Sequence, residues 1–167
     1  IEIGAALIKQ GFRHIILLNG NRPSGTANDQ VARHLIDEYD TLYEFMVSAV
    51  SYWEPAAAEI HKMRKSSEGG MGHAGELETS FQLATRPHLV KMELLEGAHY
   101  GPVAWDLVAP THPTRTYSKR PRPQVGHAAI FGDPTYATAD MGNSCIRVIV
   151  DALEQTFNNI KASYEER

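Results

Sequence analysis

The order of elements near the N-terminus constrains the fold more than any other feature of this sequence. Residues 3–10, IGAALIKQ, carry apolar side chains at helical spacing, and Gly11 follows where a helix-ending glycine is expected. The next run, HIILLNG, has the length and apolar character of a strand and ends in an Asn-Gly turn signal. A short helix followed by a wholly apolar strand predicts an α/β protein whose sheet is buried on both faces.

The same pattern occurs a second time along the chain. Asn28 or Asp29 is suited to cap a second helix, and residues 42–53 are the next expected strand. The apolar residues of this second helix recur at helical spacing: Val31, Leu35 and Ile36. The repetition supports an α/β class and one domain over residues 1–167.

Two further helices are expected after a mixed, partly helical segment. The first covers residues 76–85, because Pro87 prevents it from continuing far. The second begins at Thr138 or Asp140 and runs toward the C-terminus. Its apolar stripe consists of Ile146, Ile149, Val150, Leu153 and Phe157.

Composition excludes several classes of protein. The chain has 167 residues, of which 43% are hydrophobic and 22% charged, as in ordinary globular domains. No apolar run approaches the roughly 18 residues of a membrane span, and no signal peptide is recognisable, so we expect a cytoplasmic protein without a membrane partner. The net charge of -4 and the interspersed charges give no footprint for nucleic acid. Cys145 is the single cysteine and forms no internal disulfide, in agreement with a reducing compartment.

The segment GMGHAGELETS, residues 70–80, is the strongest candidate for a site. Its small residues, Gly72 among them, let backbone or substrate approach closely, and His73 can gain or lose a proton near neutral pH. Glu76 and Glu78 begin the expected helix, where the helix dipole favours carboxylates. Two interpretations stay open, since glutamates in a first turn are common caps and a lone histidine is more often structural than catalytic.

Other segments carry weaker signals. Tyr52 and Trp53, at the end of an expected strand, are suited to wall a small-molecule pocket or to lie in the core. The loop NGNRPSGT, residues 19–26, lacks the glycine and lysine pattern of a phosphate loop and is better explained as a turn. Asp133, followed by a proline, is expected to organise a turn before the last helix.

Three segments together resemble the creatininase family of metal-dependent amidohydrolases. GFRHIILLNG resembles the strand that leads to the family's Asn-Gly-His-Gly-Gly-Asn loop, GMGHAGELETS resembles its His-Ala-Gly-Glu-x-Glu-Thr-Ser motif, and FGDPTYATADMGN resembles its Gly-Asp-Pro segment. The matches follow the family's order and span most of the chain. The resemblance implies a three-layer α/β/α sandwich around a mostly parallel sheet, usually assembled as a homohexamer.

The resemblance also implies a reaction and a set of site residues. Family members hydrolyse a C–N bond in cyclic amides such as creatinine, in formamides or in small peptides, and hold one or two divalent metal ions, zinc, manganese or iron, per subunit. On this basis His73 is the expected catalytic proton carrier and Glu78 the expected metal ligand. The expected substrate-binding residues are Trp53, Gly72 and Glu76.

Two departures from the family pattern concern the metal. The loop reads NGNRPSG, without the family's ligating histidine, and the family's other ligands precede this loop on a segment that the sequence does not contain. Either the sequence is the C-terminal two thirds of a longer parent chain and omits an N-terminal segment and a three-residue loop, which we favour, or the protein is a short homologue without a metal centre. The alternative functions are a non-catalytic small-molecule-binding or oligomer-scaffold domain and, within the class, a peptidase- or deformylase-like member in cofactor maturation.

Overall fold

In the computed structural model, residues 1–95, 106–108 and 130–165 are described, and their helices and strands divide between two units. The first unit contains Ile1–Pro55 and Ala152–Arg167, and the second contains Ala56–Asp151. Helix α5, Ala139–Glu165, contributes to both units.

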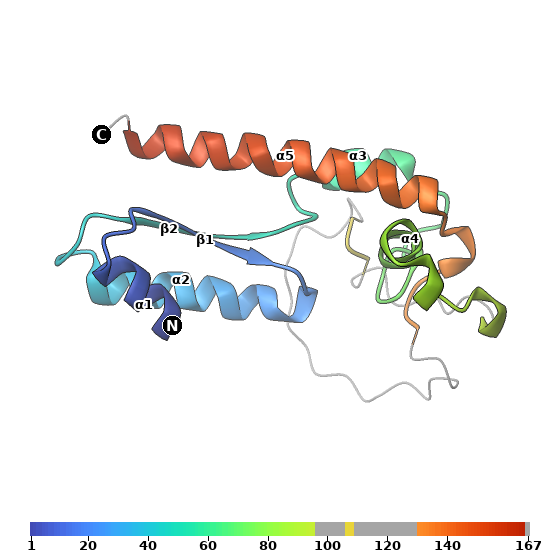
Figure 1. Ribbon diagram of the computed structural model, residues 1–167, viewed down its shortest axis with the longest axis horizontal. Coiled ribbons are helices and arrows are strands. Elements are labelled where there is room, and N and C mark those ends of the chain that lie inside the picture. Colours follow the sequence, from blue (N-terminus) through green and yellow to red (C-terminus); the bar gives the residue numbers. More distant parts are fainter. Residues whose placement is uncertain (96–105, 109–129, 166–167) are drawn as a thin grey trace. The chain divides into compact units, whose positions relative to one another are not determined.

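The first unit is built on two parallel strands. Strand β1, His14–Asn19, pairs with β2, Met46–Ser51, in a register that places His14 opposite Met46 and Asn19 opposite Ser51. Figure 1 shows helices α1, Glu2–Lys9, and α2, Gly25–Tyr39, on one side of the strands and the C-terminal part of α5 on the other. A helix on each side of a parallel strand pair is the arrangement that the α/β pattern predicts.

The core of this unit joins α1, α2 and the strands. Ile8 and Leu35 are its most deeply buried large side chains. The buried members of the cluster are Ala5, Ile8, Ile15, Ala32, Leu35, Tyr39 and Val47. The structure thus confirms the helix expected over residues 3–10 and the strand HIILLNG. The strand is not completely buried on both faces, because Leu18 is 51% exposed.

The second helix and second strand have other bounds than predicted. The α2 helix begins at Gly25, so Asn28 and Asp29 lie inside it and the predicted cap is wrong. A 3-10 turn over Arg22–Ser24, with a proline in its first turn, leads directly into α2 and sets its start. The β2 strand is shorter than residues 42–53, because the backbone after α2 continues as a turn in which the Tyr43 amide donates to the Tyr39 carbonyl.

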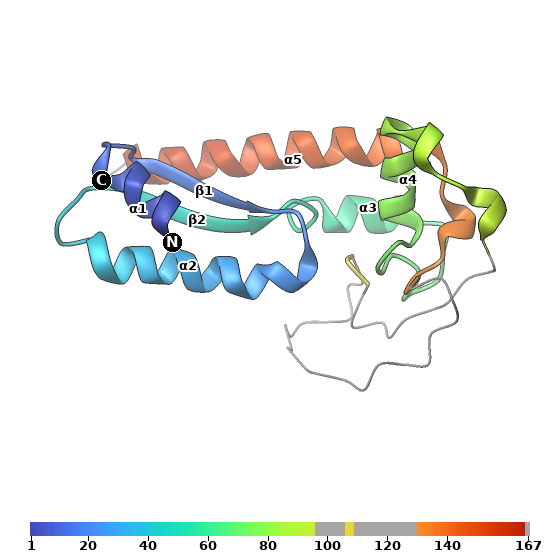
Figure 2. The same cartoon turned by 60° about the horizontal axis from the view of Figure 1, so that its bottom comes forward.

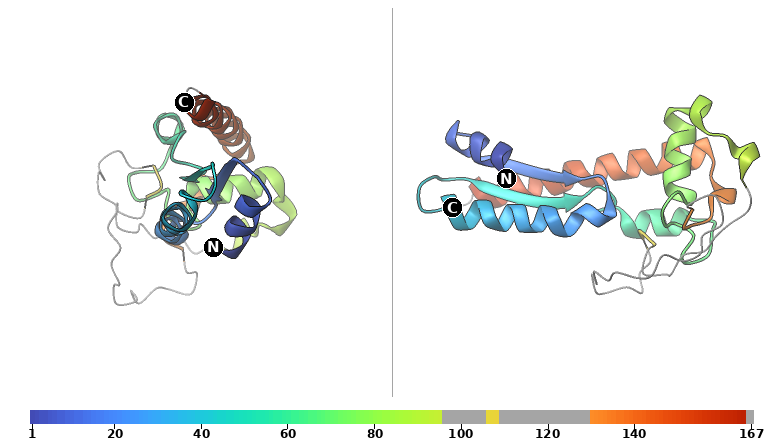
Figure 3. Two further views of the ribbon diagram at one scale, coloured as in Figure 1. Left: turned by 90° about the vertical axis from the view of Figure 1, so that its left-hand side faces the viewer. Right: turned by 90° about the horizontal axis from the view of Figure 1, so that it is seen from below.

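The second unit carries the candidate site and is mainly helical in the described residues. It contains α3, Ala57–Met63, α4, Glu76–Thr85, the N-terminal part of α5, and 3-10 turns over Pro87–Leu89, Met92–Leu94 and Pro134–Tyr136. Figures 2 and 3 show α4 running across the N-terminal end of α5. The predicted bounds of α4 are confirmed, and Pro87 opens a 3-10 turn instead of a further helical turn.

The junction between α4 and α5 is held by hydroxyl groups. Ser80 is fully buried, and its hydroxyl accepts a hydrogen bond of 3.1 Å from the Thr138 amide. The Thr138 hydroxyl in turn accepts from the Met141 amide at 3.1 Å, as an N-cap does, which confirms the predicted helix start. Among the helices that the structure describes, none combines the length and apolarity needed to cross a membrane.

Candidate active site

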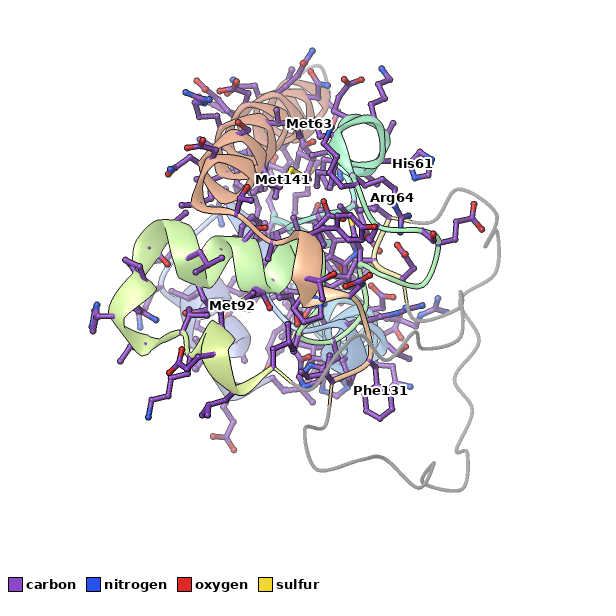
Figure 4. The ribbon with its side chains drawn as sticks, turned by 90° about the vertical axis from the view of Figure 1, so that its right-hand side faces the viewer. His61, Met63, Arg64, Met92, Phe131 and Met141 are labelled. Carbon is purple, nitrogen blue, oxygen red and sulfur yellow. The ribbon has the colours of Figure 1, made fainter. Side chains whose placement is uncertain are left out.

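Close backbone packing explains the small residues of the loop that carries His73. A Cβ atom on Gly72 would lie 1.9 Å from the carbonyl oxygen of Phe131, and one on Gly75 would lie 2.1 Å from the carbonyl oxygen of Gly70. Phe131 lies on the segment that leads toward α5 (Figure 4). Any side chain at Gly72 or Gly75 would therefore collide with backbone, and the space next to Gly72 on this side is filled by Phe131.

The backbone next to His73 has an unusual conformation at Ala74. The carbonyl of His73 accepts a 2.9 Å hydrogen bond from the Phe131 amide. The next residue, Ala74, has φ 53°, the left-handed region that residues with a Cβ rarely adopt. Its carbonyl accepts from the Thr79 hydroxyl at 3.0 Å. A non-glycine residue in this region is held there by its surroundings, and such positions cluster at functional sites.

Glu78 connects this loop to α4. Its Oε2 atom accepts a 2.7 Å hydrogen bond from the Ala74 amide and lies 3.6 Å from His73 Nδ1. The side chain of His73 is 68% exposed and that of Glu78 is 38% exposed. The structure therefore brings the predicted proton carrier and the predicted metal ligand together, with the imidazole accessible to a small molecule.

Glu76 is in a different environment. It has no exposed surface, and its carboxylate accepts hydrogen bonds from the Lys65 amide, the Ser66 amide and the Ser66 hydroxyl at 2.6–3.1 Å. These bonds join the start of α4 to the loop after α3. The predicted contact of Glu76 with a substrate stays a prediction, and its hydrogen bonds indicate a structural role.

Trp53 belongs to the first unit, whereas Gly72, His73, Glu76 and Glu78 belong to the second. Its side chain is buried, and its ring meets the Tyr52 ring edge to face, with centroids 4.9 Å apart and an interplanar angle of 88°. This packing fits the core interpretation of the two aromatics. The loop before α2 contains a 3-10 turn, in agreement with the turn interpretation of NGNRPSGT.

Sequence reasoning missed Arg64 and Asp106. The structure pairs them in a buried ion pair with Nη2 and Oδ2 2.8 Å apart. The sequence signal for this pair is the single aspartate in the apolar stretch VAWDLVA. An apolar stretch favours burial, and a buried carboxylate requires a partner. The predicted turn at Asp133 is confirmed: Asp133 is buried, and its Oδ1 accepts from the Thr135 amide at 3.0 Å in the turn before α5.

Cys145 is buried in the same unit, on α5. Burial, and to a smaller extent the negative charge of Glu76, raises the pKa of the Cys145 thiol from 9.0 to about 11. The thiol is therefore protonated at neutral pH and is a poor nucleophile. It acts as a small apolar group in the interior of this unit and has no part in the proposed chemistry.

The raised pKa predicts a loss of stability in alkali. The unfolded thiol ionises first, so the contribution of Cys145 to folding is present below about pH 9 and declines as the pH rises toward about 11. We expect the free energy of unfolding in urea to fall more steeply over this range in the wild type than in Cys145→Ser. Parallel curves for the two proteins would contradict the assignment.

The described residues do not fit the metal centre that the resemblance implies. His73 and Glu78 supply neighbouring donor groups, but the described part of the chain holds no group of three or more His, Cys, Asp or Glu side chains suited to a metal ion. Catalytic metal sites commonly use three protein ligands and one open position. That Glu78 is a metal ligand stays a prediction.

A family model for creatininase, described as creatinine amidohydrolase, matches residues 1–157. The chain belongs to the creatininase family. This confirms the resemblance carried by the three sequence segments. Among curated proteins, none matches the chain.

Solved creatininase structures share the fold. A structure described as creatininase Mn has 20% sequence identity and a TM-score of 0.64, with 98% of this chain and 61% of that chain covered. A glutamate-to-glutamine mutant of Zn-Zn type has 22% identity and a TM-score of 0.63, with the same coverage. A glutamate-to-glutamine mutant complexed with creatine has 21% identity and a TM-score of 0.63, with 95% and 61% covered.

These similarities establish the creatininase-like α/β fold. They also show that the chain spans 61% of the length of the creatininase structures that it matches. The neighbours are manganese and zinc forms, which supports a divalent metal in the family.

Proposed function

We propose that this creatininase-family protein hydrolyses a C–N bond in a small cyclic amide, with His73 as the proton carrier. The observation that carries the proposal is the pairing of His73 Nδ1 with Glu78 Oε2 at 3.6 Å, on a loop held by backbone contacts. The family membership of residues 1–157 supports the reaction class.

The pair is suited to proton transfer in amide hydrolysis. Hydrolysis requires that a proton leaves the attacking water and that the departing nitrogen gains one, and a single imidazole can do both. With Nδ1 directed toward Glu78, the other ring nitrogen, Nε2, is the atom available to the reacting groups. The Glu78 carboxylate, fixed by the Ala74 amide, orients the imidazole.

The proposal includes a divalent metal cofactor, one or two ions per subunit, of zinc, manganese or iron. The described residues hold no complete ligand set, so a complete set needs residues besides them. For Glu78 we propose the imidazole contact as the main role, since the oxygen that the Ala74 amide fixes, Oε2, is the one that faces His73 Nδ1. No step of the proton transfer above depends on where the metal lies.

The substrate proposal rests on the class of reaction and on one neighbour. That neighbour is a creatininase complexed with creatine, a small molecule. We propose a small amide as the substrate here. The substrate contacts of Trp53 and of Gly72 are each a prediction from the resemblance. For Glu76 we propose an indirect role through the Lys65–Ser66 backbone, because the carboxylate is buried. Assembly as a homohexamer remains a prediction that light scattering of the purified protein can check.

Metal content and turnover of Glu78→Gln separate the two roles of Glu78. If Glu78 orients His73, the complete protein should keep its metal while kcat falls about tenfold or more, because the neutral glutamine amide holds the imidazole more weakly than the carboxylate does. The measurement is elemental analysis together with steady-state kinetics. Loss of the metal in Glu78→Gln would instead identify Glu78 as a ligand.

Metal binding by the wild-type protein tests the proposed function as a whole. The proposal expects about one or two transition-metal ions per subunit. A complete protein that binds none after refolding with excess zinc or manganese would end the proposal and favour the non-catalytic scaffold.

A further inference from the structure

A buried carboxylate outside the GMGHAGELETS motif holds the start of the loop that carries His73. The side chain of Asp106 has no exposed surface. Its Oδ2 accepts hydrogen bonds from the Gly69 amide at 2.8 Å and the Met71 amide at 3.3 Å, and its Oδ1 accepts from the Val108 amide at 3.0 Å. Three backbone amides on one carboxylate fix the backbone around it, since charge-assisted hydrogen bonds are stronger than neutral ones.

Arg64 completes this anchor from the end of α3 (Figure 4). Its side chain is 8% exposed, and its Nη2 lies 2.8 Å from Asp106 Oδ2. Its Nε donates to the Ser66 carbonyl at 2.9 Å, and Nη2 also donates to the Ser67 carbonyl. One rigid guanidinium therefore joins the loop after α3 to Asp106, which a flexible ammonium group cannot reproduce.

The anchor is connected to His73 through the backbone. The Leu107 amide donates to the Met71 carbonyl at 3.1 Å, and Met71 is fully buried. Two residues later the His73 carbonyl accepts from Phe131, and the Ala74 amide is held by Glu78. Asp106 thus fixes the loop before His73, whereas Phe131 and Glu78 fix it at and after His73.

We propose that Asp106, paired with Arg64, is a positioning residue that sets the geometry of His73 for proton transfer. The inference rests on the proposed function for its catalytic part. Its structural part is independent of activity: without the Asp106 charge, the contacts at Gly69 and Met71 weaken and the loop loosens as far as Ala74. The Arg64 Nη1 atom is buried without a partner among the described residues, so Arg64 is left poorly satisfied when Asp106 loses its charge.

Amide hydrogen exchange, resolved by residue in the complete protein, tests the structural part. In Asp106→Asn we expect the amides of Gly69 and Met71 to exchange about tenfold faster or more, because a charged acceptor is replaced by a neutral one. The Ala74 amide, which Asp106 does not contact, should also exchange faster. Unchanged exchange at Ala74 with faster exchange at Gly69 and Met71 would overturn the proposal.

Two further variants keep the test decisive. Arg64→Lys retains the positive charge but loses the forked guanidinium. It should therefore increase the exchange rate of the same amides, but less than Asp106→Asn does. If Asp106→Asn does not fold, Arg64→Lys provides the test. Glu59→Gln removes one partner of the exposed Glu59–Lys62 ion pair on α3 and should change none of these amides. Acceleration of the loop amides in Glu59→Gln equal to that in Asp106→Asn would contradict a specific anchor.

Kinetics test the catalytic part. A positioning role predicts that Asp106→Asn lowers kcat about tenfold or more with little change in KM, because the imidazole is misplaced while the rest of the site is intact. If neither the wild type nor Asp106→Asn shows turnover, that result counts against the proposed function. The hydrogen-exchange result still stands in that case. Unchanged kcat with a loosened loop would overturn the positioning role.

Discussion

Replacing His73 by alanine should lower kcat by about 10²–10⁴-fold, the usual contribution of a positioned general acid or base. The fold should be unaffected, because the imidazole is 68% exposed and its removal leaves no buried cavity. The loop backbone keeps its contact with Phe131, which uses the His73 carbonyl and not the side chain. The measurement is steady-state kinetics of the complete, metal-loaded protein, with the melting temperature and metal content as checks on folding.

The matched control is His34→Ala. His34 lies on α2, is exposed, and pairs with Glu38 at 2.9 Å, so it is another histidine next to a glutamate, but in the other unit. Its replacement should leave kcat unchanged. Wild-type turnover in His73→Ala, or an equal loss in both variants, would remove His73 from the mechanism.

Gly72→Ala should destabilise the protein by at least about 2–3 kcal/mol, a large share of the stability of a small protein. The added Cβ would lie 1.9 Å from the Phe131 carbonyl oxygen, and both partners are backbone, so neither can move aside without disturbing the loop. The expected result is a lower midpoint of urea unfolding. Activity should fall as well, because the same segment pairs with Phe131 at His73.

Gly20→Ala is the control for this prediction. A Cβ on Gly20 meets nothing within 4 Å, so the same chemical change should alter stability by only a few tenths of a kcal/mol. Similar unfolding midpoints for Gly72→Ala and wild type would show that the loop does not pack against Phe131 as described.

Local sequence signals predicted much of the fold. The helix over residues 76–85 has the predicted bounds, since Gly75 and Pro87 enclose it, and the α/β class followed from the apolar run of β1. The start of α2 was mispredicted, because a helix-compatible 3-10 turn precedes it and no side-chain cap marks its first residue. Spacing alone also placed Ile36 and Val150 on buried stripes, although the structure exposes both.

The sequence predicted only those site residues that lie within residues 70–80. His73 and Glu78 are five residues apart and meet across the start of α4, which sequence spacing can indicate. Asp106 contacts the Gly69 amide across 37 positions of sequence, and such a contact depends on tertiary structure that no local pattern encodes. The small residues of the loop predict a close approach of a substrate or of backbone, and at Gly72 the neighbour is the backbone of Phe131.

Hydrolysis of a panel of small cyclic amides by the complete protein, loaded with manganese or zinc, tests the central claim most directly. Ring opening can be followed by mass spectrometry of the products. The account predicts that at least one cyclic amide is hydrolysed by the wild type and that the rate is lost in His73→Ala. A folded, metal-loaded wild type that hydrolyses none of them would contradict it.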